Sequence, residues 1–418
     1  MNVLLFGRGA HIFSLIRKLG NSCCLENLYV AGELDVNCPN NNLVKYIYFD
    51  SLCDYKNFVK EKDIDLVVIP STPSLSSFVN IFKYNFGVPT IGVTRYWAQL
   101  ESSKLFAKEF MQKYDLPCSE YSVMKSEKDV ESCIDKYGLP LVVKDNTLQA
   151  GFGVSICKTK NECIKQVKKI LKKDKFCIVE KYLIGKEVTL HTIWDGDTLV
   201  PLEAVKDYKR LENGDKGINT GSMGSYVPVF LTEKEKEMMS EYVQKLEEAF
   251  KIAKPNFTGI FVSDLFFTED KVYNLEFNMR PGTPEFEVLV EHLDCDLLEL
   301  LYKTAVSELK DVKIKYKSGY TGAVVVVHKD YKSPTKQGKL TKIKIPQNFI
   351  NDCADIIVNT RINKISKKNE AVIDSHLRVF TFLKNDVLNP FDKIYKQVYK
   401  LNDKNLYYRT DIGNDLNA

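Results

Sequence analysis

The chain opens with short apolar runs that alternate with amphipathic segments, and few folds accommodate this order. Strands are expected at Val3–Phe6, Leu28–Ala31, Tyr46–Phe49, Leu66–Ile69 and Thr90–Gly92. Residues 12–19, 54–61 and 75–84 show the spacing of helices. This β-α-β order implies a parallel sheet with helices on both faces. Ligands of such sheets bind beyond the carboxyl ends of the strands.

The middle of the chain, from about residue 100 to residue 320, is typical of an α+β arrangement. Capping boxes are expected at Ser126 with Asp129, at Thr159 with Glu162 and at Thr232 with Glu235. The strands expected here are Leu141–Lys144, Val154–Cys157, Cys177–Glu180, Val188–Trp194 and Phe261–Phe267. The last part contains apolar runs at Ala323–His328 and Arg378–Leu383. It predicts a small, separate β-rich domain.

Length and charge limit the classes of protein that fit. A chain of 418 residues corresponds to two to four domains at roughly 100–200 residues each. The 59 Lys and Arg against 55 Asp and Glu give a net charge of +4, which offers no reason to expect a nucleic-acid partner. No apolar run reaches the ~18 residues needed to cross a bilayer, and the start lacks a signal-peptide pattern. We expect a cytoplasmic enzyme with no membrane partner.

Two glycine-rich turns are candidate phosphate sites. Gly7–His11 lies between the first strand and the first helix, but the third glycine of a dinucleotide fingerprint is missing. It fits a tight structural turn or another phosphate site. The turn at 149–154 fits either a loop over nucleotide phosphates or an ordinary hairpin. Lys144, just before that second turn, ends an apolar strand where its charge can meet phosphate.

A predicted hairpin carries the most informative polar residues. One strand holds Asp264, residues 268–271 form the turn, and the returning strand holds Glu276 and Asn278. Residues two apart on a strand face the same side, and Asp264 can face them from the partner strand. Two carboxylates and an amide oxygen suit Mg²⁺ shared with phosphates, and Arg280 continues that face. The alternative is an exposed polar strand face.

A long glycine-rich stretch, residues 207–226, shows little periodicity inside an otherwise ordered region. Loops of this kind are more often functional than neutral. The alternative is a surface Ω-loop.

Several segments, in this order, resemble the phosphoribosylamine–glycine ligase family of the ATP-grasp superfamily. Residues 99–104 (QLESSK) are similar to its QLEGSK, and residues 180–187 to its EEFLxGEE hinge. Residues 207–210 and 219–226 resemble DHKR and NTGGMGAY. Residues 275–280 resemble the start of EFNxRFGDPE, with Pro284 and Glu285 also present, and residues 408–413 resemble FRxDIG. The resemblance covers nearly the whole chain.

The resemblance implies a multidomain α/β and α+β fold. An N-terminal Rossmann-like domain would span 1–99, and an ATP-grasp domain would span 100–320 with a lid at about 118–186. A C-terminal domain would span 321–418. The implied activity is ATP-dependent joining of a carboxylate to an amine through an acyl phosphate, with ATP and Mg²⁺ or Mn²⁺. Small-molecule substrates and a monomer or homodimer are expected.

The resemblance also implies roles for individual residues. Those expected to bind ATP are Lys104 and Lys144 at the phosphates, Gly151 and Gly153 in the lid loop, Glu180, Lys181, Tyr182 and Leu183 at adenine, and Glu187 at the ribose. The expected metal ligands are Glu276 and Asn278, with Asp264 as a third ligand at the position where D-alanine–D-alanine ligase carries a metal-binding carboxylate. The residues expected at the acceptor and acyl phosphate are Lys209, Arg210, Asn219, Thr220, Gly221 and Arg280.

Four segments depart from the family pattern. GNGGREHA is replaced by residues 7–14, and the GPE loop by Pro70-Ser71-Thr72. Phe152 stands where the lid has a lysine, and 281–287 (PGTPEFE) replaces FGDPETQ. Two of these departures lie where the family holds phosphoribosylamine, so they concern the acceptor more than the ATP chemistry.

Three functions follow from these observations. The first is a phosphoribosylamine–glycine ligase. The second is a related ligase that uses another amine or amino acid, which the altered N-terminal motifs would explain. The third is a nucleotide-binding protein without catalysis, which Phe152 would explain.

Overall fold

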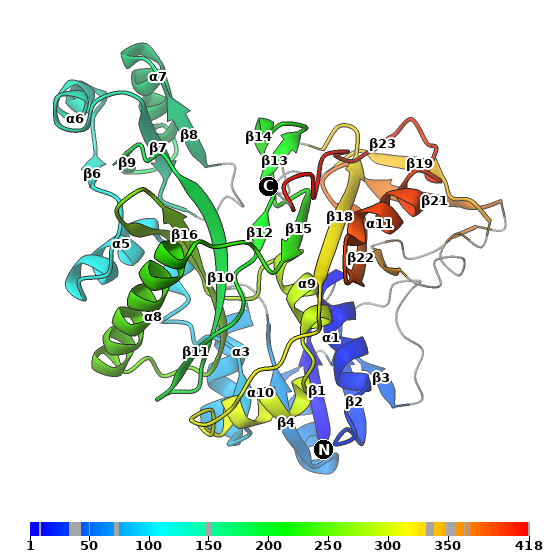
Figure 1. Cartoon of the computed structure of the whole chain (residues 1–418). Helices are drawn as coiled ribbons and strands as arrows, with labels where there is room; N and C mark the ends of the chain where they lie inside the picture. Colours follow the sequence, from blue (N-terminus) through cyan, green and yellow to red (C-terminus); the bar gives the residue numbers. More distant parts are fainter. Residues whose placement is uncertain are drawn as a thin grey trace.

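The structure is a computed structural model, and it consists of three regions arranged around a central junction (Figure 1). It describes residues 1–7, 10–32, 43–49, 51–70, 75–147, 153–331, 338–347, 349, 356–360, 362, 365–366 and 368–416. Within this part of the chain, no helix has both the length and the apolar character that a bilayer crossing requires.

The N-terminal region is a five-stranded sheet whose strands are all parallel, as the alternation predicts, and the structure gives their order as β3-β2-β1-β4-β5. The elements are β1 (Asn2–Phe6), α1 (Ala10–Gly20), β2 (Asn27–Ala31), β3 (Val44–Ile47), α2 (Leu52–Glu61), β4 (Ile64–Val68), α3 (Ser76–Asn80), the π-helical turn Ile81–Phe86 and β5 (Thr90–Ile91). The third strand begins at Val44, earlier than its apolar run suggests. The sheet is covered by apolar clusters on both faces.

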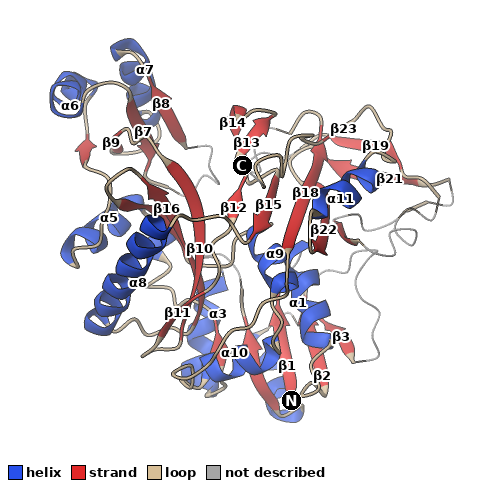
Figure 2. Ribbon diagram, in the orientation of Figure 1, coloured by secondary structure: helices blue, strands red, loops and turns tan. Residues whose placement is uncertain are grey.

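The middle region holds two four-stranded sheets, which lie one above the other in Figure 2. The lid sheet, in the order β6-β9-β7-β8, contains β6 (Tyr121–Met124), α6 (Val130–Tyr137), β7 (Leu141–Asp145), β8 (Val154–Cys157), α7 (Lys160–Leu171) and β9 (Cys177–Lys181). The body sheet, in the order β11-β10-β16-β17, contains β10 (Lys186–Trp194), β11 (Leu199–Pro201), β16 (Gly259–Phe267) and β17 (Val272–Asn278), with α4 (Gln99–Ser102), α5 (Lys104–Lys113) and α8 (Glu233–Ala253) nearby.

Two of the three expected capping boxes form. Thr159 with Glu162 begins α7, and Thr232 with Glu235 begins α8. The box at Ser126 is wrong: its hydroxyl accepts from the backbone of Lys128 at a short 3₁₀ turn, Glu127–Asp129, that precedes α6.

The C-terminal strands share a sheet with two short strands from the middle of the chain. Strands β18 (Tyr320–His328), β20 (Ile357–Thr360), β22 (Arg378–Asp386) and β23 (Leu406–Tyr407) share one sheet with β12 (Lys206–Asp207) and β15 (Gly224–Val227). Helix α11 (Pro390–Val398) packs on β18 and β22, and β19 (Leu340–Lys344) pairs with β21 (Glu370–Asp374). The glycine-rich stretch 207–226 therefore belongs structurally to this sheet, and the domain boundary near residue 320 remains a prediction.

Helix α9 (Glu285–His292) lies at the junction of the three regions. It contacts α1 of the N-terminal region and strands β15, β18 and β22 of the C-terminal sheet. It begins shortly after β17, and α10 (Leu297–Ala305) follows it. The polar residues at its start are therefore placed where all three regions can supply partners.

Candidate active site

The predicted hairpin forms, and its polar residues share one side. Asp264 in β16 lies directly opposite Glu276 in β17, and Asn278 lies opposite Val262. The amide nitrogen of Asn278 is 3.4 Å from an oxygen of Asp264, whose side chain is only 5% exposed. The hydroxyl of Thr189 donates to the other Asp264 oxygen at 3.1 Å. Two carboxylates and an amide thus gather on this face of the sheet.

Lys209 brings a positive charge to this hairpin. Its ammonium is 2.9 Å from Asp264 and also contacts Glu187 on the neighbouring strand β10. Burial alone would lower the pKa of Lys209, but the carboxylates of Asp264 and Glu187 outweigh it and raise that pKa well above its usual value. The lysine is therefore an ammonium ion at neutral pH.

The donor set at the hairpin fits a hard divalent cation. Asp264, Glu276 and Asn278 offer carboxylate and amide oxygens, the ligands that Mg²⁺ prefers. The Lys209 ammonium against Asp264 shows that this side of the hairpin attracts positive charge. The ligand roles of these three residues stay a prediction.

Arg280 is held by a buried acid that the sequence argument did not single out. The Arg280 guanidinium donates to Glu101 at 3.0 Å, and the other Glu101 oxygen accepts from the backbone of Met279 at 3.0 Å. Arg280 also approaches the Asn278 amide oxygen at 3.4 Å. Glu101 belongs to the QLESSK segment, so that motif carried the signal for this residue.

The expected nucleotide side is organised around Glu180. Its carboxylate contacts Lys144 at 2.9 Å and Lys108 at 3.3 Å, and it accepts a hydrogen bond from Ser119. Burial alone would raise the pKa of Glu180, but the two lysines outweigh it and lower that pKa to about 2. Lys108 was not predicted, although it lies one helical turn after Lys104 on α5. The Lys104 ammonium donates to the carbonyl of Thr147 at 3.1 Å, close to the lid.

The segment after Glu180 connects the lid to the body. Lys181 ends β9 and contacts Glu120 at the surface, and the side chain of Tyr182 is exposed. Gly185 lies two residues after Leu183. A Cβ on this glycine would lie 1.9 Å from the carbonyl oxygen of Phe267. Only glycine permits this close approach to β16. In the lid turn, Gly153 accepts a hydrogen bond from Asp145, whereas Gly151 and Phe152 lie outside the described residues.

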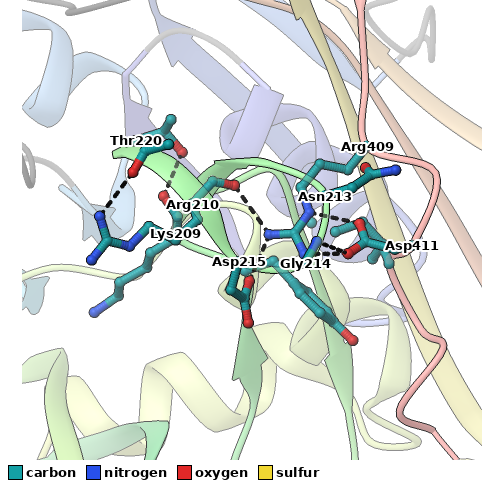
Figure 3. Close-up of polar contacts among 12 residues, drawn as sticks. Lys209, Arg210, Asn213, Gly214, Asp215, Thr220, Arg409 and Asp411 are labelled. Carbon is teal, nitrogen blue, oxygen red and sulfur yellow. Dashed lines mark hydrogen bonds and ion pairs between the residues drawn. The ribbon is translucent and has the colours of Figure 1, made fainter.

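The predicted acceptor residues separate into two groups (Figure 3). Lys209 reaches the hairpin, and Thr220 donates to the Lys209 carbonyl through both its backbone and its hydroxyl. Arg210 turns instead onto its own small hairpin, formed by β13 (Arg210–Glu212) and β14 (Lys216–Asn219), and donates to the carbonyl of Gly217 at 2.9 Å. Asn219 pairs with Arg210 in that hairpin, and the Gly221 carbonyl accepts from Arg378.

A buried polar cluster adjoins the site at the start of α9. Asp207, Glu285 and Glu287 lie in it, and burial raises the pKa of each carboxyl. Asn359 donates to one Glu287 oxygen, while Arg378 contributes a guanidinium group nearby. Among the described residues, the second Glu287 oxygen and one Glu285 oxygen have no hydrogen-bond partner. The sequence argument mentioned Glu285 and Glu287 only as parts of an altered motif.

A buried histidine supports the turn beside this cluster. His191 accepts a hydrogen bond from the backbone of Gly282 at 3.0 Å. Burial and the charge of Arg280 lower the pKa of His191 to about 3, so the ring is neutral and can accept. The Pro281-Gly282 turn that departs from the family pattern is thereby held in place.

The lid, the body sheet and the carboxylate-bearing hairpin together define an ATP-grasp protein. The model of the phosphoribosylglycinamide synthetase ATP-grasp (A) domain matches residues 102–286. Phosphoribosylamine–glycine ligases of Clostridium acetobutylicum and of Listeria monocytogenes serotype 4b are each 30% identical to this chain, over 99% of this chain and 99% of theirs. The chain belongs to the phosphoribosylamine–glycine ligase family.

Solved structures agree with this fold. The crystal structure of the phosphoribosylamine–glycine ligase from Thermotoga maritima is similar with a TM-score of 0.77 at 22% identity, covering 98% of this chain and 100% of that one. The biotin carboxylase domain of Hydrogenobacter thermophilus 2-oxoglutarate carboxylase, solved with MgADP and bicarbonate, has a TM-score of 0.68 at 16% identity, covering 97% and 91%. Both likenesses extend over all three regions.

Proposed function

We propose that this chain joins glycine to phosphoribosylamine with ATP and forms glycinamide ribonucleotide, ADP and phosphate. The observation that carries the proposal is the alignment of Asp264 with Glu276 on the hairpin, with Asn278 and the Lys209 ammonium beside them. Full-length relatives named phosphoribosylamine–glycine ligase support the choice of substrates.

The reaction needs an activated carboxylate, because a free carboxylate is a poor electrophile. A glycine carboxylate oxygen attacks the γ-phosphorus of ATP, the bond to ADP breaks, and an acyl phosphate forms. The amine nitrogen then attacks the acyl carbon, phosphate leaves, and the nitrogen loses a proton. The protein contributes mainly position and charge in such transfers.

Two cations of this chain are placed to offset phosphoryl charge. Lys209 lies against Asp264, and Arg280 is fixed by Glu101 beside Asn278. Preorganised charges of this kind act strongly where water is excluded. Lys104 and Lys144 would contact the ATP phosphates from the lid side. The segment Glu180–Leu183 would hold adenine, and Glu187 the ribose.

Asp264, Glu276 and Asn278 would hold Mg²⁺, or Mn²⁺ in its place. Such an ion supplies charge neutralisation at the phosphates of the bound nucleotide. Asp264 would also keep the Lys209 ammonium in reach of the same phosphates. The Asp264 carboxylate would then contact both the metal ion and Lys209. Arg210 and Asn219 would act by shaping the β13–β14 hairpin, and Thr220 and Gly221 by fixing the backbone next to Lys209 and Arg378.

A second candidate function is a ligase with a different amine acceptor. It is favoured by the altered Pro281-Gly282 turn and by the buried carboxyls of Glu285 and Glu287, each with one oxygen that has no hydrogen-bond partner in the described part of the chain. A buried acidic cluster is better matched to a cationic or hydroxyl-rich acceptor than to a phosphate group.

The test combines the purified chain, ATP, Mg²⁺, glycine and freshly generated phosphoribosylamine, and measures ADP and the amide product by mass spectrometry. Substrate-dependent ADP release that is lost in Glu276→Ala supports the proposal. No product above background rejects this substrate pair. A panel of amines and amino acids then decides the second candidate, which strict preference for glycine and phosphoribosylamine would eliminate.

A further inference from the structure

Residues 408–415, here called the C-terminal segment, lie against the small β13–β14 hairpin. Figure 3 shows Arg409 and Asp411 from this segment facing Asp215 and Arg210 of the hairpin. The Arg409 side chain is only 1% exposed, and arginine is seldom buried to this extent unless it is paired. A buried guanidinium must be paired on all sides to be tolerated.

All three nitrogens of the Arg409 guanidinium donate hydrogen bonds. It makes a bidentate contact with Asp411 at 2.8 and 2.7 Å. Its third nitrogen donates to Asp215 at 2.7 Å and to the backbone carbonyl of Arg210 at 3.1 Å. The same group lies 5.1 Å from the ring centre of Tyr208. Arg409 thus contacts both neighbours of Lys209 in sequence.

The rest of the C-terminal segment strengthens this contact. Asp411 accepts from the backbone of Gly214 at 2.8 Å, and Asn213 and Thr410 exchange two hydrogen bonds at 2.7 and 3.1 Å. The hydroxyl of Tyr208 donates to Asp415 and accepts from the backbone of Gly413. The hairpin is therefore held along its length and on both sides of Lys209.

We propose that Arg409 is a positioning residue that keeps the Lys209 ammonium at the metal-binding hairpin. The backbone of Lys209 is fixed by Tyr208 and Arg210, both held by Arg409, and by Thr220, which donates twice to the Lys209 carbonyl. From that fixed backbone, the side chain reaches Glu187 and Asp264. The effect on activity rests on the proposed ligase function, whereas the effect on Lys209 does not.

Two features distinguish this role from simple attachment of the C-terminus. An apolar residue at position 409 would secure the segment without burying a charge. In addition, one Arg409 contact is made to the Arg210 carbonyl, a backbone atom next to Lys209, and not to the outer part of the hairpin. The expected nucleotide contacts at Glu180–Leu183 lie on the lid side, whereas Glu187, the expected ribose ligand, contacts Lys209 directly.

The experiment compares Arg409→Lys with Ile394→Val. The first keeps a positive charge but loses the planar, multidentate contacts. The second removes a methyl group from the buried core of the same C-terminal region and serves as the control for lost stability. The full-length variants are compared for kcat, for the KM of glycine, for the ATP dissociation constant and for the unfolding midpoint.

A second readout does not depend on turnover. Lysines are labelled with an acylating reagent and quantified by mass spectrometry, because the contacts with Glu187 and Asp264 limit access to the Lys209 ammonium in the native chain. Labelling of Lys393, an exposed surface lysine paired with Asp386, provides the internal reference.

We expect Arg409→Lys to lower kcat at least about tenfold and to increase Lys209 labelling several-fold. Ile394→Val should show neither change at a similar loss of unfolding midpoint. Unchanged Lys209 labelling in Arg409→Lys would overturn the positioning role. A native chain without turnover would refute the substrate proposal alone, since the labelling result still decides the role of Arg409.

Discussion

The ammonium of Lys209 lies 2.9 Å from the carboxylate of Asp264, although Lys209 lies outside the sheet that contains Asp264. Lys209 stands between β12 of the C-terminal sheet and the β13–β14 hairpin, whereas Asp264 lies in the middle of the body sheet. The contact therefore joins the expected acceptor side of the site to the expected metal side. Its geometry depends on how these two parts pack.

Replacing Asp264 with asparagine tests the hairpin as a metal site. The change removes one of the two carboxylates of the expected metal site. It also leaves the Lys209 ammonium with Glu187 as its remaining carboxylate partner. We expect kcat/KM to fall about 100-fold or more and the Mg²⁺ concentration for half-maximal rate to rise. ADP release measured across a Mg²⁺ titration checks this. The exposed Asp115→Asn variant is the control, and an unchanged Mg²⁺ dependence in Asp264→Asn would contradict the assignment.

Replacing Glu101 with glutamine tests whether Arg280 must be fixed to act. The amide can still accept from Met279, but it loses the ion pair with Arg280. We expect kcat to fall about tenfold with little change in the KM for ATP, because a misplaced charge stabilises the transition state poorly. Steady-state kinetics measure both quantities. Glu109→Gln, on the exposed face of α5, should behave like the native chain. A native-like kcat in Glu101→Gln would refute the role of Glu101 in fixing Arg280.

The sequence alone was sufficient where the evidence is local. The hairpin with Asp264 opposite Glu276 follows from alternating side chains and a short turn, and two of three capping boxes form where their residue pairs indicate. The parallel direction of the strands in the N-terminal sheet follows from the alternation of strands and helices. These features depend on residues near each other in the chain.

The remaining features depend on packing between distant segments. Lys144 meets Glu180 because β7 and β9 pair in one register, and Lys108 joins them only because α5 lies beside that sheet. Nothing near position 409 in the sequence indicates Asp215 as its partner. The sharing of one sheet by β15 and β18 is likewise a long-range pairing.

Replacing Gly185 with alanine tests the connection between the lid and the body. The added Cβ would overlap the carbonyl oxygen of Phe267, so the segment or β16 must shift. We expect a loss of about 1–3 kcal/mol in the free energy of unfolding, together with weaker ATP binding. Chemical denaturation and nucleotide titration measure the two effects. Ile184→Ala, at the exposed neighbouring position, is the control, and a native-like Gly185→Ala would show that this close approach is not required.

The stability of the chain in acid should depend on Glu180. Its pKa is lowered from 4.5 in the unfolded chain to about 2 in the fold, where burial is outweighed by Lys144 and Lys108. The folded state therefore binds fewer protons than the unfolded state between these values. The stabilisation is fully present above about pH 5 and is lost as the pH falls toward 2.

Glu180→Gln should remove this dependence and leave two buried lysines without their carboxylate. We expect the variant to lose about 3–5 kcal/mol of unfolding free energy at pH 7, since breaking a buried ion pair strands the remaining charges. Its stability should also change less than that of the native chain between pH 5 and pH 3. Urea denaturation at several pH values measures both, with the exposed Glu120→Gln as control. Parallel pH profiles for Glu180→Gln and the native chain would contradict the lowered pKa.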